Sequence, residues 1–304
     1  MAISRAQLVK ELEPGLNALF GLEYKRYENQ HTEIYTTESS DRAFEEEVML
    51  SGFANAEVKA EGSGVSFDEA QETYTARYTH DTIALAFAIT EEAIEDNLYD
   101  RLASRYTKAL ARSMSNAKQV KAAAPLNNGL SSVATFKAGD TVSLFSTNHT
   151  TVSGTAVKNT LTTQADLNET SLEQGLIDIA GMTDERGLRV AARGMKMIVP
   201  SANQFAAERL MKSQGRTGTA DNDINAVVSM GMVPQGYRVN NFLTDTDSWY
   251  IITDVPNGMK MFQRAALKTA MEGDFDTGNV RYKARERYSF GVSDYRGIFG
   301  VEGA

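Results

Sequence analysis

Histidine is the side chain best suited to move a proton or bind a metal ion near neutral pH, and this chain has three, His31, His80 and His149. They are far apart in the sequence and form neither an H-x-x-x-H nor an H-E-x-x-H spacing, so no helical zinc site is predicted. We interpret each as a surface or hydrogen-bonded histidine. The chain contains no cysteine, which excludes disulfides, thiolate metal sites and cysteine nucleophiles.

Aspartates in D-x-D pairs are the second group with suitable chemistry, because closely spaced carboxylates bind calcium and similar cations. The pairs are Asp221 with Asp223, Asp245 with Asp247, and Asp274 with Asp276. None extends to the calcium-loop pattern with a glutamate at its twelfth position, so we interpret them as turn residues. A soluble, metal-dependent hydrolase that uses these pairs stays open as the alternative from another class of function.

Motifs for phosphate binding and acyl transfer are also missing. Gly215-Arg216-Thr217-Gly218 lacks the lysine of a phosphate loop, no G-x-G-x-x-G follows a strand pattern, and no G-x-S-x-G occurs. An enzyme of this size usually shows one such constellation, although folding can also bring distant residues together. We therefore predict no catalytic residue, no cofactor and no metal, and favour a structural role.

The strongest charge pattern is a cationic row near the C-terminus. Even positions from Val280 to Val292 are almost all apolar, whereas the odd positions carry Arg281, Lys283, Arg285 and Arg287. This alternation predicts a strand with one packed face. The cationic row could contact phosphate, remain solvated, or pair with acidic side chains of a neighbouring molecule, such as Glu45, Glu46 and Glu47. Because the net charge is −9, we favour the neighbour over nucleic acid.

A long helix is the element around which the other predicted elements are arranged. No glycine or proline occurs between Gly64 and Pro125, and apolar residues recur every three or four positions from Thr90 to Ala124. Acidic residues lie in its first turns and basic residues in the later ones, which suits the helix dipole. We expect this spine helix to be about 50 Å long, with Pro125 ending it.

Extended structure is predicted ahead of the spine helix. Tyr74, Ala76 and Tyr78 alternate with polar residues, and the alternation continues from Ile83 to Ile89. Val48, Leu50 and Phe53 could supply the partner strand, with residues 61–64 at the tip. A lone hairpin is marginally stable in water, so we expect a projecting arm that binds a partner, with an ordinary edge hairpin as the alternative.

Shorter elements surround this frame. An N-terminal arm begins with a short helix around Gln7 to Leu12, breaks at Pro14-Gly15, and ends in an apolar patch at Leu16, Leu19 and Phe20 that a neighbour could hold. Residues 127–165 read as loops with short strands. Helices near 168–180 and 203–212 and strands at 195–199, 237–239 and 249–253 predict a compact α/β unit.

No membrane or secretory segment is predicted. The longest apolar run, Ile83 to Ile89, is too short to span a bilayer. Residues 1–12 contain charges and no apolar core of signal-peptide length. We therefore expect a soluble protein without a membrane partner.

The order of these elements resembles the major capsid proteins of tailed phages, which have the Hong Kong 97-type fold that encapsulins also use. Residues 85–97 (LAFAITEEAIEDN) are similar to that family's junction between hairpin and spine helix, and residues 144–149 (LFSTNH) look like a segment of Mu-like major head subunits. The resemblance implies an α+β capsid fold with an N-terminal arm (1–35), an extended β-hairpin loop (36–85), a peripheral domain (86–165 and 259–304) with the spine helix (90–124), and an inserted axial domain (166–258).

The resemblance also implies a function and a set of contacts. Such a subunit assembles with itself into hexamers and pentamers, in the host cytoplasm, as the icosahedral shell of a virion around double-stranded DNA. Scaffolding, portal and decoration proteins would be further partners. An encapsulin-like compartment is the alternative. We expect subunit contacts at Lys59, Glu61, Gly62, Ser63, Gly64, Tyr74, Arg77, Tyr78, Arg281, Lys283, Arg285 and Arg287.

Some relatives cross-link covalently through a lysine and an asparagine, with the help of a glutamate. Lys59 lies in the predicted hairpin, but no asparagine partner can be aligned by motif, so cross-linking is not predicted here.

Overall fold

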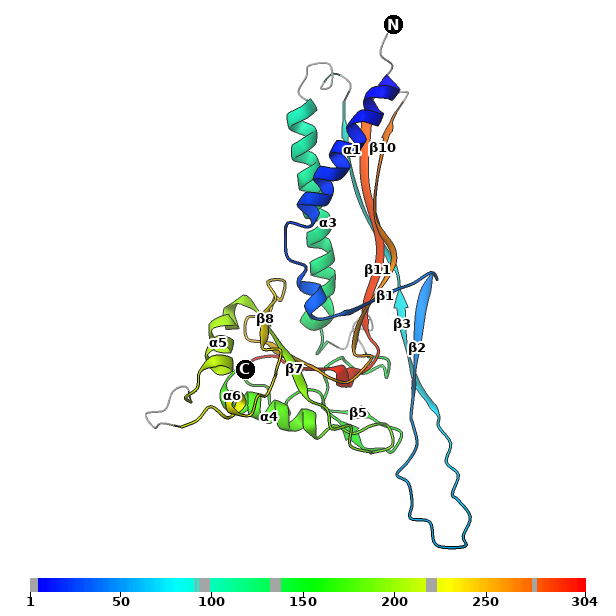
Figure 1. The fold of residues 1–304 in the computed structure, drawn as a ribbon, viewed down its shortest axis with the longest axis vertical. Helices are drawn as coiled ribbons and strands as arrows, with labels where there is room; N and C mark the ends of the chain where they lie inside the picture. Colours follow the sequence, from blue (N-terminus) through cyan, green and yellow to red (C-terminus); the bar gives the residue numbers. More distant parts are fainter. Residues whose placement is uncertain (1–4, 91, 93–98, 132–137, 217–222, 275–277) are drawn as a thin grey trace.

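The computed structural model describes residues 5–90, 92, 99–131, 138–216, 223–274 and 278–304. Figure 1 shows an elongated molecule in which one long helix and several long strands run along a common axis. A compact unit lies at one end of this axis, and a thin hairpin projects beside it.

A four-stranded sheet and helix α3 form the elongated part. The strand order is β1 (Thr36–Ser39), β10 (Met259–Gly273), β11 (Val280–Val292) and β4 (Asp81–Ile89). Helix α3 (Tyr99–Asn127) has 29 residues, which span about 44 Å. Apolar residues of α3 are buried against Tyr282 and Ala284 of β11, among them Ala103, Leu110, Ala111 and Met114. Burial of this narrow apolar stripe holds the helix along the sheet.

Two sequence predictions about this part can be tested directly. The alternation in β11 is confirmed, because even positions from Val280 to Tyr288 are buried and Arg281, Lys283 and Arg285 are exposed. Pro125 does not end the helix, because α3 continues to Asn127. Ala122 and Leu126, on either side of the proline, are buried in a core cluster with Tyr35 and Tyr250, and this packing outweighs the local cost of proline. Residues 91 and 93–98, at the predicted start of the spine helix, lie outside the described residues.

The N-terminal segment also differs from its prediction. It is one helix, α1 (Arg5–Tyr24), with Pro14 inside it, so the predicted break at Pro14-Gly15 is wrong. Leu16 and Phe20 are buried in the same cluster as α3 and β11. The apolar patch is therefore covered by the chain's own spine helix and does not require a neighbour.

A buried polar cluster fastens α1 to the spine. Lys118 Nζ lies 3.0 Å from Glu286 Oε2, and the Glu286 side chain has no exposed surface. The hydroxyl of Tyr24, at the end of α1, donates to the same oxygen of Glu286 at 3.4 Å. Burial beside Glu286 raises the pKa of Tyr24 above its ordinary value, so the phenol stays protonated and can donate. Three elements thus meet at one carboxylate.

His31 belongs to the 3-10 helix η1 (Gln30–Glu33) that follows α1, and it is held as a neutral ring. Gln119 Oε1 accepts from the His31 backbone N–H at 3.0 Å, which directs the Gln119 amide nitrogen toward His31 Nδ1 at 2.9 Å. Nδ1 must therefore accept. Burial, with the charge of Lys118 nearby, lowers the pKa of His31 from 6.5 to about 4.

This arrangement predicts a pH dependence of stability. Below pH 6.5 the unfolded chain protonates His31 while the folded chain does not until pH falls to about 4, so the stabilisation is complete above pH 6.5 and is lost over that interval. The expected loss is about 3 kcal/mol. Urea unfolding at pH 7 and pH 4.5 should show a smaller stability difference for His31→Gln than for the unchanged protein. Equal differences would contradict the prediction.

The projecting hairpin is formed by β2 (Phe44–Leu50) and β3 (Glu72–Thr79), which pair antiparallel with Val48 opposite Thr75. The predicted hairpin pairing is thereby confirmed. β4 does not continue the hairpin but pairs with β11, and β1 pairs with β10. Residues 51–71 carry no strand and form the distal arm, with a turn at residues 61–62.

The compact unit contains a second sheet in the order β12 (Ile298–Val301), β9 (Trp249–Thr253), β7 (Gly194–Val199) and β8 (Tyr237–Val239). Helices α4 (Glu169–Ala180), α5 (Gln204–Lys212) and α6 (Ala226–Ser229) accompany it. Its core includes Leu172, Ile179, Met197, Trp249 and Phe299. The predicted helices and strands of this α/β unit are confirmed, and Asn168 caps α4.

The loop region between α3 and α4 holds two short strands, β5 (His149–Thr150) and β6 (Ala156–Val157), as predicted. The 3-10 helices η3 (Ser201–Asn203) and η4 (Tyr295–Gly297) complete the elements. In the part of the chain that the structure describes, no helix combines the length and apolarity needed to cross a membrane.

Candidate subunit-interface surfaces

The distal arm exposes large apolar side chains along its length. Val58 is fully exposed, Phe67 is 96% exposed, and Phe53 and Val65 are 60% and 68% exposed. Four such residues within the 21 residues of the distal arm are an unusual concentration of solvent-exposed apolar surface, which in soluble proteins marks a contact site. From the sequence, Phe53 is predicted only as part of a strand and the other three are not predicted as contact residues, although bulky residues are spaced among Ser, Gly and Glu in this segment.

The tip of the distal arm holds the first group of predicted contact residues. Lys59, Glu61, Gly62, Ser63 and Gly64 are all exposed. Gly62 has a φ of 81°, a left-handed conformation that favours glycine, and the Ser63 N–H donates to Ala60 O at 3.2 Å. The tip is thus a built turn that presents Lys59 and Glu61 to the surroundings.

The base of the hairpin is different, because the predicted contact residues there are covered by their own chain. Tyr78 is 3% exposed and packs edge-on against Phe262 of β10, with ring centroids 4.8 Å apart. Its hydroxyl lies 2.5 Å from Ser293 Oγ. Tyr74 is half-buried beside Tyr295. Both tyrosines therefore attach the hairpin to the body instead of offering a free surface. Arg77 remains exposed, with its guanidinium 4.0 Å from the centre of the Phe44 ring and 3.6 Å from Glu46.

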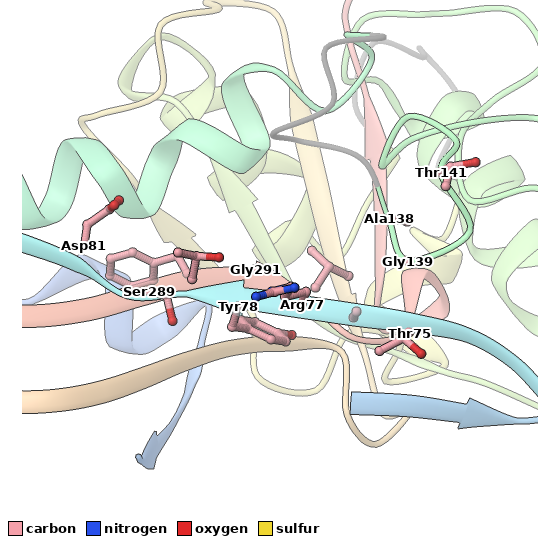
Figure 2. Close-up of a pocket in the computed structure, with 13 residues that line it drawn as sticks. Thr75, Arg77, Tyr78, Asp81, Ala138, Gly139, Thr141, Ser289 and Gly291 are labelled. Carbon is pink, nitrogen blue, oxygen red and sulfur yellow. The ribbon is translucent and has the colours of Figure 1, made fainter. Parts of the chain in front are cut away.

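Figure 2 shows the cavity beside this base, with Arg77 and Tyr78 of β3 next to Gly291 of β11 and the loop at Gly139. Its volume is about 620 Å³. A side chain at Gly139 would come within 2.3 Å of the Tyr74 ring, and one at Gly291 within 2.6 Å of the Tyr78 ring. The two glycines let the tyrosines approach the backbone closely, so the base is packed firmly even though a cavity opens next to it.

Ion pairs reinforce the same base. Lys260 of β10 contacts Glu47 of β2 and lies 3.1 Å from Glu38 of β1. Burial alone would lower the pKa of Lys260, but the two carboxylates outweigh it and raise the pKa. Glu47 also accepts from Ser293. A buried lysine that is paired twice ties three strands together.

The cationic row lies on the face of the sheet that points away from α3. Arg281 is 2.5 Å from Asp274 Oδ2. Within the described residues, Lys283, Arg285 and Arg287 have no acidic partner. Their neighbours in register on β4 are small, with Ala86 opposite Lys283 and Ala84 opposite Arg285, and both alanines are exposed. Lys283 and Arg285 are therefore exposed cations on a chain with a net charge of −9, whereas Arg287 is half-buried.

The candidate catalytic residues occupy structural positions. His149 is buried, contacts Asp140 at 2.6 Å and Asn159 at 3.1 Å, and stacks on Tyr295. His80 contacts Ser40 and Ser289. The prediction of hydrogen-bonded histidines is confirmed for these two and for His31.

The aspartates that the structure describes do not gather into a metal site. Asp245 Oδ1 accepts from the Asp247 N–H at 3.1 Å, which is the turn contact expected of such a pair. Asp221 and Asp276 lie outside the described residues. Among the residues that the structure describes, no group of three or more His, Cys, Asp or Glu side chains is arranged to hold a metal ion.

Two features central to this architecture were missed in the sequence. Residues 259–273 form β10, the strand that joins β1 to β11, although Met259, Met261, Leu267 and Met271 show a partial alternation. Glu286 was grouped with the apolar face of β11, yet it is the buried partner of Lys118. An acidic residue at an apolar position was the available signal.

A long spine helix on an elongated sheet, a projecting hairpin and a compact α/β unit define the class of shell-forming subunits with the Hong Kong 97-type fold. The sequence model of the phage capsid protein family matches residues 73–301. The chain belongs to this family, and it is a structural major capsid protein of a phage virion.

Solved structures share the fold at low sequence identity. The capsid of an empty GTA particle has a TM-score of 0.58 and 14% identity, over 92% of this chain and 91% of that one. The procapsid of bacteriophage JBD30 has a TM-score of 0.54 and 14% identity, over 99% and 77%. A virus-like particle from Pyrococcus furiosus has a TM-score of 0.51 and 10% identity, over 94% and 98%. No curated protein matches the chain.

Proposed function

We propose that copies of this chain assemble into hexamers and pentamers that close an icosahedral shell around double-stranded DNA. The exposed apolar side chains of the distal arm carry this proposal. The arm projects away from the body of its own subunit (Figure 1), so we expect another molecule to cover these side chains. Identical copies that contact one another through different surfaces form rings and closed shells.

The two predicted contact surfaces fit each other in charge. Glu46 and Glu47 are engaged by Arg77 and Lys260 of their own chain, so they are poorer partners for a neighbour than the sequence suggested. Glu57 and Glu61 of the distal arm are exposed and have no ion pair within the described part of the chain. We propose that the distal arm of one copy lies on the cationic row of the next, where these carboxylates meet Lys283 and Arg285.

The remaining assignments extend the same proposal. In this proposal the N-terminal arm is residues 1–35 and the extended loop is residues 36–85. The peripheral domain is residues 86–165 and 259–304, and the axial domain is residues 166–258. Scaffolding, portal and decoration proteins would join during assembly in the host cytoplasm. The acidic balance of the chain would limit counterion-releasing contacts with the packaged DNA.

Electron microscopy of the purified full-length protein tests the proposal. Closed shells of uniform diameter that protect DNA from nuclease are the expected result. Shells that instead contain a cargo protein would favour an encapsulin-like compartment, which shares the fold. Monomers that stay compact at high concentration would contradict assembly altogether.

A further inference from the structure

The distal arm is long enough that its direction matters for any contact it makes. Residues 51–61 span about 35 Å if extended, and the strand pairing of the hairpin ends at Leu50 and Glu72. A rotation of about 10° at the base would move the tip by about 6 Å, which exceeds the ~4 Å range of a side-chain contact. Something beyond the β2–β3 pairing must therefore hold the arm in one direction.

Arg186 of the compact unit is the side chain that reaches the arm. Its guanidinium donates to the backbone oxygen of Glu69, and it lies 3.7 Å from Asp68 Oδ1. Asp68 in turn accepts from the Ala54 N–H at 2.7 Å, across the arm. Arg186 thus contacts one side of the arm directly, and Asp68 links that side to the other. These are the contacts of Arg186 with the arm in the described residues, and its side chain is only 19% exposed.

The turn that carries Arg186 is rigid. Asp184 Oδ1 accepts from the N–H groups of Arg186 and Leu188 at 2.9 and 2.8 Å, and the Asp184 N–H donates to Leu188 O at 2.7 Å. Gly187 takes a φ of 85°, which favours glycine. The Ser153 N–H donates to Glu185 O, which fixes the turn to the preceding loop. Arg186 therefore extends from a fixed platform.

The neighbouring residue of the same turn is linked to the hairpin indirectly, through Arg296. Glu185 is 3% exposed and lies 3.9 Å from Arg296 Nη2. Arg296 also contacts Asp294 at 2.9 Å and Met49 of β2 at 3.7 Å. The same turn therefore contacts the arm directly through Arg186 and is connected to β2 through Glu185 and Arg296.

We propose that Arg186 is a positioning residue that sets the direction of the distal arm in the free subunit, before a neighbour binds. The benefit of a fixed direction rests on the proposed role of the arm in subunit contacts. The direction itself is a property of a single chain and can be measured without assembly. Pre-organisation of this kind lowers the entropy cost of each contact made during assembly.

The chain lacks cysteine, so two introduced cysteines can be labelled without background. Spin labels at Ser66→Cys in the arm and Ser201→Cys in the compact unit, both at exposed positions, report the arm's direction in dilute subunits. We expect a narrow distance distribution, at least twofold broader with Arg186→Ala and partly restored with Arg186→Lys. Arg189→Ala is the matched control, because Arg189 lies in the same region but donates to Gly181 O and not to the arm.

The outcomes separate this inference from the proposed function. An unchanged distribution in Arg186→Ala, with an unchanged circular dichroism spectrum, would overturn the positioning role whether or not shells form. Broadening with Arg189→Ala of the same size would assign the effect to general loosening of the turn and also overturn it. If broadening is specific to Arg186 while assembly proceeds normally, the positioning role stands and the arm's role in assembly fails.

Discussion

Removing residues 55–66 should prevent the formation of closed shells while leaving the subunit folded. All twelve residues are exposed, and Asp68 and Ala54, which bridge the two sides of the arm, are retained. The deletion removes Val58 and Val65, whose burial would contribute about 1.5–3 kcal/mol each. Losing both should raise the concentration needed for assembly by about a hundredfold or more. Light scattering and electron microscopy measure the threshold and the product.

Substitutions that keep the full length of the arm separate the effect of apolar burial from the effect of arm length. Val58→Ser with Val65→Ser keeps the backbone and should reproduce most of the loss. Ser66→Ala, at an exposed position of the same arm, should have little effect. Shells that form from the deletion variant at the usual concentration, with unchanged thermal stability, would show that the arm has no clasping role.

Replacing Lys118 by methionine should destabilise the subunit by about 3–5 kcal/mol, because it leaves the carboxylate of Glu286 buried without its cation. Glu286 has no exposed surface, and its other oxygen, Oε1, has no hydrogen-bond partner in the described residues. Because Tyr24 donates to the same carboxylate, α1 should also loosen from α3. Urea unfolding gives the stability, and proteolysis near Lys25 and Arg26 reports release of α1.

The double variant Lys118→Met with Glu286→Leu should recover most of that stability, since an apolar pair of similar volume needs no compensating charge. Lys121→Met is the control on the same helix. Lys121 pairs with Asp81, but both side chains are well exposed, and the expected cost is below about 1 kcal/mol. Equal costs for Lys118→Met and Lys121→Met would contradict the role given to the buried pair.

Patterns that depend on local periodicity were readable without coordinates. The alternation in residues 280–292, the helix near 168–180 and the hairpin of β2 and β3 are confirmed. Pro14 and Pro125 show the limit of such reasoning. Each lies inside a helix because Leu16, Phe20, Ala122 and Leu126 are buried around them, and a local rule cannot include that energy.

The predicted contact residues show the same difference between what local sequence indicates and what packing decides. The exposed tip, Lys59 and Glu61 to Gly64, was identifiable from its turn composition, whereas Tyr74 and Tyr78 had the same strand alternation as an exposed edge. Only the approach of Gly139, Gly291 and Phe262 covers them.

The sequence by itself determined the type and order of most elements, because side-chain period is a property of neighbouring residues. The capsid fold followed from the resemblance of that order to a known family, and β10 was missed. Tertiary structure alone decided which charges meet. Lys118 and Glu286 are 168 residues apart, and Arg186 reaches Glu69 across 117. Such pairs carry no signal in local spacing, since their distance is set by how whole elements pack. The direction of the arm therefore follows only from the tertiary structure, in which Arg186 of the compact unit contacts it.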